Sequence, residues 1–165
     1  MPFGSEGPPP SGAHARQLAR RLVERWEGED AAELRPVFLV ALPERDAAAG
    51  YLVIGSVPDL ALAASYASSL GCTHALVGAY RAAGGARSLE VSLADVASKA
   101  AVATVALAAP PGELHRLEPA LDSWLAGALG IASRHDGAAL PAANEAAYAA
   151  VLEAMDDEVN ATLLR

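Results

Sequence analysis

The chain has 165 residues, 12 of them basic and 20 acidic, and its formal net charge of −8 argues against a protein that binds nucleic-acid phosphates. The length predicts one compact domain, and the single cysteine, Cys72, excludes a disulfide within one chain. The apolar fraction of 53% includes 40 alanines, so the larger apolar residues are about as frequent as in ordinary globular proteins.

Residues 1–12 are predicted to form a disordered tail, because proline and glycine are frequent there. They contain neither the basic segment nor the apolar segment of a secretory signal peptide. The longest weakly polar run, at 100–109, is too short for a transmembrane helix, which needs about 20 residues. We therefore expect a cytoplasmic protein without membrane insertion.

A helix is predicted over residues 14–27, where leucines and Trp26 recur every fourth residue on one stripe. The arginines of this segment fall largely outside that stripe: they are Arg16, Arg20, Arg21 and Arg25. We favour a solvated face, because exposed charges on a helix are the usual case. The alternative is a basic face that binds a partner, with Arg16, Arg20 and Trp26 as candidate residues of the interaction surface.

Two short β-favouring runs follow, at 36–42 and 51–55, and the polar turn between them predicts a hairpin. A helix is then expected from Asp59 to Leu70, with its alanines on the inner face. Gly71 is placed as the C-cap of this helix, because glycine adopts the left-handed conformation without steric cost.

Three strands in series are expected next, over residues 73–81, 87–94 and 100–108. The first two are joined by a glycine-containing loop, which predicts a hairpin. The middle strand alternates between apolar residues and polar ones such as Glu90 and Ser92. This alternation is typical of a sheet with one buried face.

A further helix is expected from Glu113 to Leu129, with leucines and Trp124 directed inward. Glu118 and Asp122 are expected to point away from the core. Residues 131–143 contain few large apolar side chains and are predicted to be a linker.

The last helix occupies residues 144–165, and Asn144 is placed as its N-cap. Its apolar stripe includes Tyr148 and Leu152, and the acidic run at 156–158 is expected to be a solvated face. Three arrangements remain open: the helix packs back on the domain, which we favour, pairs with another chain, or begins a longer helical array.

Together these elements predict an α+β domain over residues 13–130. Its sheet is expected to be mixed and largely antiparallel, with about five strands and with helices packed on one face. The last helix is a C-terminal extension of this domain.

The middle of the chain resembles a known family. Residues 70–81 read Leu-Gly-Cys-Thr-His-Ala-Leu-Val-Gly-Ala-Tyr-Arg, and residues 89–95 read Leu-Glu-Val-Ser-Leu-Ala-Asp. Over about residues 56–130 this pattern resembles the TolB amino-terminal-like family and the related FlgO-like and CsgG-like domains. The resemblance implies a small α/β domain, and residues 144–152 resemble the tetratricopeptide-type helix that often follows it.

The residues that carry this resemblance are expected to shape the backbone. Gly71 supplies a left-handed exit from a helix, and Gly78, inside a strand, indicates close approach of another group. Asp95 is expected to accept backbone N–H bonds across the following turn. The family usually carries a Thr-Gly turn after this aspartate, whereas this chain has Ser98 and Lys99 there.

No local motif predicts chemistry. The sequence has neither a phosphate-binding glycine loop nor a hydrolase nucleophile elbow. His115 and Glu118 could share a helix face, but no further metal ligands stand at motif spacing. Cys72 is interpreted as a small buried hydrophobe, and it would be a nucleophile only if His74 lay within hydrogen-bond reach. We therefore assign no catalytic, cofactor-binding or metal residues.

These observations predict a non-enzymatic protein-interaction or scaffold domain with an unidentified protein partner. The docking surface is expected at the sheet edge, the Trp26-bearing helix or the last helix, with Tyr148 and Leu152 as candidates. One alternative is a small-molecule-binding protein or small enzyme whose site is assembled from distant residues. Another is a homodimerisation module that uses the last helix.

Overall fold

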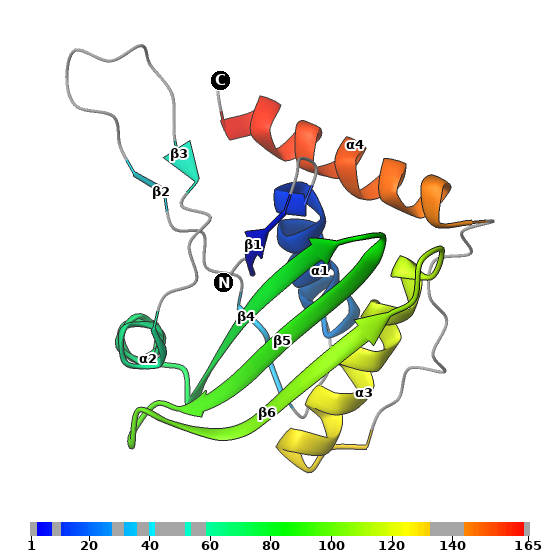
Figure 1. The fold of residues 1–165 in the computed structure, drawn as a ribbon. Coiled ribbons are helices and arrows are strands. Elements are labelled where there is room, and N and C mark those ends of the chain that lie inside the picture. Colours follow the sequence, from blue (N-terminus) through cyan, green and yellow to red (C-terminus); the bar gives the residue numbers. More distant parts are fainter. Residues whose placement is uncertain are drawn as a thin grey trace.

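The computed structural model describes residues 3–7, 11–27, 32–35, 40–41, 52–53, 59–132 and 144–163. Its main sheet has four strands in the order β1-β4-β5-β6. These strands are β1 (Gly4–Glu6), β4 (His74–Ala83), β5 (Ala86–Asp95) and β6 (Ala100–Ala109). Helices pack against this sheet (Figure 1), so the chain has the predicted α+β fold, with four strands in the main sheet where about five were expected.

Strand β5 lies inside the sheet and pairs antiparallel with β4 on one side and with β6 on the other. Its residues alternate as predicted: Leu89, Val91 and Leu93 are buried, whereas Glu90 is exposed on the opposite face. The side chains of one face of the sheet therefore form the floor of the hydrophobic core.

Two helices cover this buried face: α1 (Ser11–Arg25) and α3 (Leu117–Leu129), which follows the short 3₁₀ helix η1 (Leu114–Arg116). The last helix, α4 (Glu145–Leu163), packs against α1 and η1 (Figure 1). Of the three arrangements left open for the last helix, the structure therefore has the favoured one, in which the helix packs back on the domain.

Helix α2 (Leu60–Ser69) begins after Asp59, whose side chain accepts a hydrogen bond from the backbone N–H of Leu62 at 2.7 Å. It lies against the opposite face of the sheet, which differs from the expectation of helices on one face only. Small side chains form this contact, because they allow the helix backbone to approach the strands closely: Ala63, Ala67, Ala75, Val77 and Ala94.

The predicted disordered tail over residues 1–12 is wrong where the structure describes it. Gly4–Glu6 pairs parallel with β4, and Phe3 is buried in the core. A Cβ added at Gly78 would lie 2.5 Å from Cδ1 of Phe3, so the missing side chain makes room for the ring. This packing and the backbone pairing offset the entropy of ordering a segment rich in proline and glycine. Helix α1 also begins earlier than expected, at Ser11.

The turn residues have the conformations that their sequence positions predict. Gly71 has φ 70°, the left-handed value that ends a helix. After β5, the Asp95 side chain accepts a hydrogen bond from the Ser98 backbone N–H at 2.7 Å. Lys99 then has φ 56° and is the single non-glycine residue with positive φ in the part of the chain that the structure describes. It stands at the place where the TolB-like pattern has glycine.

Replacing Lys99 with glycine is therefore expected to stabilise the protein. A left-handed residue with a Cβ is strained, and removing the strain should raise the free energy of unfolding by about 0.5–1 kcal/mol. Urea denaturation measures this change. In the same turn, Ala97 does not have positive φ, so Ala97→Gly should lower stability. Equal losses for both variants would contradict the strain at Lys99.

The predicted hairpin at 36–55 lies largely outside the described residues. Its two described pieces, β2 (Val40–Ala41) and β3 (Leu52–Val53), pair antiparallel as expected. Of the predicted linker at 131–143, only the first two residues are described.

Candidate functional site

Three of the residues proposed for an interaction surface are buried. Trp26, Tyr148 and Leu152 all lie in the hydrophobic core, which corrects their assignment as docking residues. Helix α4 packs on α1 and η1, so Tyr148 and Leu152 are covered within the chain, whereas Val151 of the same helix is 42% exposed. The indole N–H of Trp26 also donates a hydrogen bond to the carboxylate of Asp122 at 2.6 Å.

A buried carboxylate on α3 holds α1 and α4 together. Glu118 is only 1% exposed, so the expectation that it points away from the core is wrong. The Arg21 guanidinium donates two hydrogen bonds to Glu118, each at 2.9 Å, and the Tyr148 hydroxyl donates a third at 2.7 Å. Since a buried charge is costly unless it is paired and hydrogen-bonded, the arginine on α1 explains the buried glutamate on α3.

Two further acidic residues are buried against α1. Asp122 accepts from Trp26 and Arg25, the latter at 3.4 Å. Asp156 on α4 accepts from Arg16 at 2.8 and 2.6 Å and from Gln17 at 3.1 Å. The expectation of a solvated acidic run at 156–158 is therefore wrong at its first residue.

Most of the arginine face of α1 is thus an internal surface. Arg16 retains a partly exposed side chain, while Arg20 pairs with Glu24 at 2.8 Å on the exposed side of the helix. An exposed pair of this kind contributes little to stability. Neither interpretation of the sequence, a solvated face or a docking face, anticipated that arginines of α1 join three helices.

The electrostatics of this cluster follow from burial and from the paired charges. Burial of Glu118 favours its neutral form, but the hydrogen bonds from Arg21 and Tyr148 outweigh that effect and hold the pKa of Glu118 below its usual range. Burial, followed by the nearby charge of Glu118, raises the pKa of the Tyr148 hydroxyl. Glu118 is therefore ionised and Tyr148 neutral near pH 7, the states in which Tyr148 and Arg21 donate hydrogen bonds to the carboxylate.

His14 on α1 predicts a pH dependence of stability. Burial lowers the pKa of His14 from 6.5. The carboxylate of Glu153, 3.3 Å from the imidazole, raises this pKa, but its effect is smaller than that of burial. The unfolded state therefore takes up a proton near pH 6.5 before the folded state does. The free energy of unfolding should fall as the pH drops below about 6.5, by at most about 1.4 kcal/mol per pH unit. His14→Gln should remove this dependence of the free energy of unfolding on pH. If the variant kept the slope of the wild type, His14 would not be its cause.

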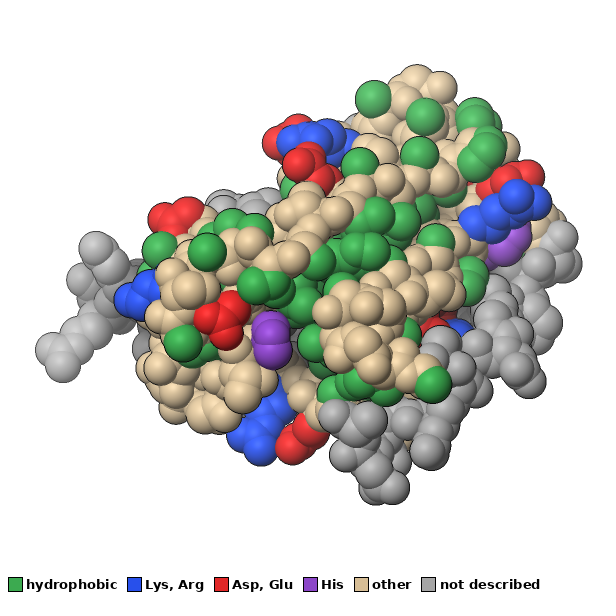
Figure 2. Space-filling view, turned by 90° about the horizontal axis from the view of Figure 1, so that it is seen from below, with side chains coloured by type: hydrophobic (Ala, Val, Ile, Leu, Met, Phe, Trp, Pro, Cys, Tyr) green, Lys and Arg blue, Asp and Glu red, His purple; other side chains and the backbone are tan. Residues whose placement is uncertain are grey.

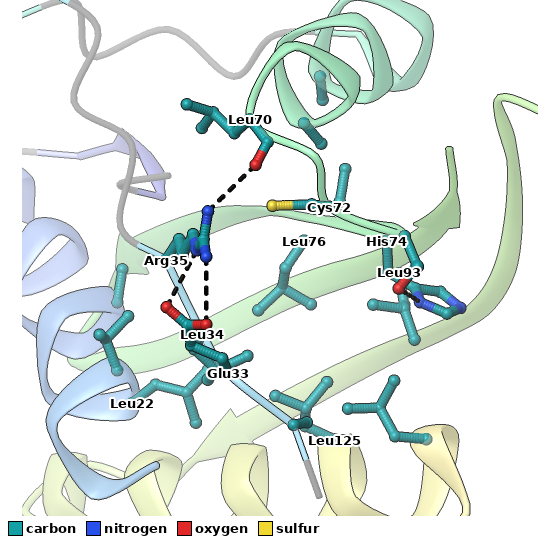
Figure 3. A pocket seen from close by; sticks show the side chains of 18 of the residues that line it. Leu22, Glu33, Leu34, Arg35, Leu70, Cys72, His74, Leu76, Leu93 and Leu125 are labelled. Atoms are coloured by element: carbon teal, nitrogen blue, oxygen red, sulfur yellow. Dashed lines mark hydrogen bonds and ion pairs between the residues drawn. The ribbon is translucent and has the colours of Figure 1, made fainter. Parts of the chain in front are cut away.

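An open cavity of about 470 Å³ lies beside the first half of β4 (Figure 3). It is formed where α1, α2, α3, segment 32–35 and the start of β4 meet. Most of its wall is apolar, and the larger apolar residues include Leu22, Leu34, Leu76, Leu93 and Leu125. A cavity of this size falls within the range of ligand-binding pockets.

The same region contains a free sheet edge. Strand β1 pairs only with Ala79, Tyr80 and Arg81 of β4. Within the part of the chain that the structure describes, no strand pairs with this edge of β4 over residues 74–78. An unpaired edge offers backbone N–H and C=O groups to an added strand; along this one His74 is exposed and Leu76 half-buried, whereas Ala75, Val77 and Gly78 are buried.

The two polar wall residues singled out in the sequence, Cys72 and His74, do not approach each other. Figure 3 shows the Cys72 sulfur pointing toward Arg35, whereas the imidazole of His74 points the opposite way. Arg35 is held by Glu33 at 3.0 Å and by the Leu70 carbonyl oxygen at 3.1 Å. The thiol and the imidazole therefore line one cavity without the contact that an activated nucleophile needs.

The cavity was missed from the sequence. Its residues come from segments far apart in the chain, and the part of the wall at 70–76 belongs to the TolB-like pattern, which by itself indicates no cavity. The single local signal was the pair Cys72 and His74, which does mark the cavity wall.

A search of known protein families finds none that matches the chain, and no curated protein matches it. In the part of the chain that is described, no helix has the length and hydrophobicity needed to cross a bilayer. The same residues contain no cluster of three or more His, Cys, Asp or Glu side chains suited to a metal ion.

Proposed function

We propose that this chain is a non-enzymatic protein-interaction domain that binds an extended peptide segment along the free half of β4. One observation carries the proposal: the unpaired edge at residues 74–78 lies next to the apolar cavity. A peptide strand added there would form main-chain hydrogen bonds with β4, and an apolar side chain would enter the cavity. The main-chain hydrogen bonds at the edge would supply the affinity for the peptide. The cavity would supply the specificity, because it selects an apolar side chain.

The burial of the other candidate surfaces supports this choice. Three docking surfaces were predicted from the sequence. On two of them, the Trp26-bearing helix and the last helix, the candidate residues Trp26, Tyr148 and Leu152 lie in the core, although Val151 stays exposed on the last helix. The sheet edge is the third. The apolar rim of the cavity is exposed at Tyr66 on α2 and at Leu70, the C-cap of this helix.

The arrangement of the polar groups supports a binding function over catalysis. Around the cavity, the guanidinium of Arg35 is occupied by Glu33 and Leu70, and His74 lies 3.0 Å from the Thr73 hydroxyl. The ion pairs with a buried carboxylate lie elsewhere, between α1, α3 and α4, where they join helices. We therefore propose no cofactor and no reaction.

We also propose a distant relationship to the TolB amino-terminal-like domains. The left-handed Gly71, the Phe3 ring over Gly78 and the Asp95 turn give physical roles to the residues that carry the resemblance. Such a relationship is compatible with a domain that acts by binding another protein.

A second function deserves a test, because the cavity alone could hold a small apolar ligand. Its volume of about 470 Å³ would accommodate a small molecule without any peptide strand. A small ligand would leave the edge of β4 unpaired, whereas a peptide would protect it.

Selection of binders from a random peptide library tests the proposal. Selected peptides should carry apolar residues at alternate positions, as expected for an added strand. Leu70→Ala should weaken their binding about tenfold, because it removes one apolar wall group. Leu62→Ala is the matched control: both leucines lie at or next to α2 with similar exposure, 42% and 43%, but only Leu70 lines the cavity. Equal effects of both variants, or no selected peptide, would contradict the proposal.

A further inference from the structure

Strand β6 forms the other edge of the sheet, opposite to the proposed peptide site. Its ten residues read Ala-Ala-Val-Ala-Thr-Val-Ala-Leu-Ala-Ala and include no charged residue, proline or glycine. Among the described residues, none pairs with its outer side. Most proteins protect an edge of this length with lysine, proline or a covering segment. The flanking Lys99 and Pro110 lie outside the strand, so the edge itself is unprotected.

The hydrophobic core is incomplete along β6. On β5, Leu89 and Val91 are fully buried, with 0% exposure. Their direct cross-strand partners on β6, Leu107 and Val105, face the same side of the sheet but are only half-buried. The apolar side chains of β6 therefore remain partly exposed at the position where a fifth strand would cover them.

Helix α3 extends this apolar surface. Glu118 and Asp122 on α3 face α1 through their contacts with arginines. Trp124 lies about 200° around the helix from Asp122, so it is on the side of α3 away from α1, and it is half-buried. Figure 2 views the molecule from below, where β6 and α3 lie in Figure 1. Hydrophobic side chains gather across the middle of this face, and charged ones lie mainly toward its margins.

We propose that a second copy of this chain occupies this surface, with the two β6 strands paired antiparallel about a two-fold axis. The two four-stranded sheets would then form one continuous sheet. Two-fold pairing places each strand against its own sequence, and like charges across such a contact are destabilising. A strand without charges avoids this repulsion. It also has no charged side chain that could pair with an opposite charge on a different protein. The partner's β6 and α3 would cover Val105, Leu107 and Trp124.

This dimer differs from the one considered from the sequence, which used the last helix. It leaves the free edge of β4 accessible, since β4 and β6 lie on opposite sides of β5. Each dimer would then present two peptide sites, one at either end of the continuous sheet.

Sedimentation equilibrium of the full chain tests the proposal with two lysine variants. Ala106 is exposed on the open face of β6, directly opposite Glu90 on β5. A lysine at position 106 can pair with Glu90 in the monomer, so Ala106→Lys should leave the fold intact. It nevertheless places a charge at the proposed interface. Ala79→Lys is the matched control, because Ala79 on β4 lies opposite the same Glu90 from its other side. Circular dichroism checks that both variants are folded.

The wild-type chain is expected to dimerise reversibly, and Ala106→Lys should raise the dissociation constant about tenfold or more, while Ala79→Lys should leave it unchanged. Amide hydrogen exchange in β6 should slow as the protein concentration rises. A wild-type chain that is monomeric up to millimolar concentration would overturn the proposal. So would a dimer that both lysine variants weaken equally. Neither outcome bears on peptide binding at β4.

Discussion

Replacing Glu118 with alanine is expected to lower the free energy of unfolding by about 3–5 kcal/mol. The carboxylate is buried and accepts hydrogen bonds from Arg21 and Tyr148, with Arg25 also within 3.5 Å. Its removal leaves two largely buried guanidinium groups and a buried hydroxyl without this shared partner. Urea denaturation followed by circular dichroism measures the loss.

The control for this variant is Glu24→Ala. Glu24 also pairs with an arginine of α1, at 2.8 Å, but both side chains of that pair are exposed. Its loss should cost less than about 1 kcal/mol. Similar values for Glu24→Ala and Glu118→Ala would show that the buried cluster does not hold the helices together.

Replacing Gly78 with alanine should destabilise the protein by about 1–3 kcal/mol. The added Cβ would lie 2.5 Å from Cδ1 and 2.9 Å from Cε1 of Phe3, so the ring must move out of its position in the core. Because Phe3 leads directly into β1, the displacement should also weaken the pairing of Gly4–Glu6 with β4. Chemical denaturation gives the change in stability, and hydrogen exchange reports on β1.

Two further variants make this prediction specific. Gly127 lies in α3 with open space around its Cα, so Gly127→Ala should raise stability by about 0.5–1 kcal/mol, as expected for glycine in a helix. In the double variant Phe3→Ala with Gly78→Ala, the two losses should not add, because the clash is gone. Additive losses would mean that the ring and the glycine do not interact.

The middle of the fold was predictable from the sequence because its signals are local. The apolar alternation around Leu89 and Val91 identifies a strand with one buried face, and the observed burial follows it. Asp59 marks the start of α2 and Gly71 its end, since each supplies the local conformation that a helix terminus requires. These features depend on neighbouring residues only.

The charged contacts between the helices were not predictable in the same way. Glu118 lies 97 residues from Arg21, and Asp156 lies 140 residues from Arg16. A helical pattern classifies each acidic residue as outward-facing, because it contains no information about a distant arginine that would neutralise it. The same limitation led to the assignment of Tyr148 as a surface residue, although its hydroxyl binds Glu118 in the core.

Strand β1 and the cavity also depend on long-range contacts. The segment Gly4–Glu6 is short and lies near a run of prolines, so its sequence has no strand pattern. It forms a strand because it pairs with β4. The cavity lies beside the part of β4 that β1 does not pair with, and its wall combines segment 32–35 with residues of α1, α2 and α3. Gly78 was the one residue whose position in a strand indicated a close neighbour, and that neighbour is Phe3.

The internal use of the charges on α1 has a functional consequence. Arginines that could have attracted an acidic partner instead bind Glu118, Asp122 and Asp156. Within the part of the chain that the structure describes, the surfaces that we propose for other proteins are therefore the two edges of the sheet, β4 with its cavity and β6 with its uncharged strand. Both would act through backbone hydrogen bonds and apolar contacts.

Hydrogen exchange of the full chain, with and without a selected peptide, tests the proposed function most directly. Peptide binding should slow the exchange of backbone amides at 74–78, because an added strand would pair with them. The amides of α4, which does not line the cavity, should be unaffected. Protection on α4, or bound peptide without protection of β4, would contradict docking at the sheet edge.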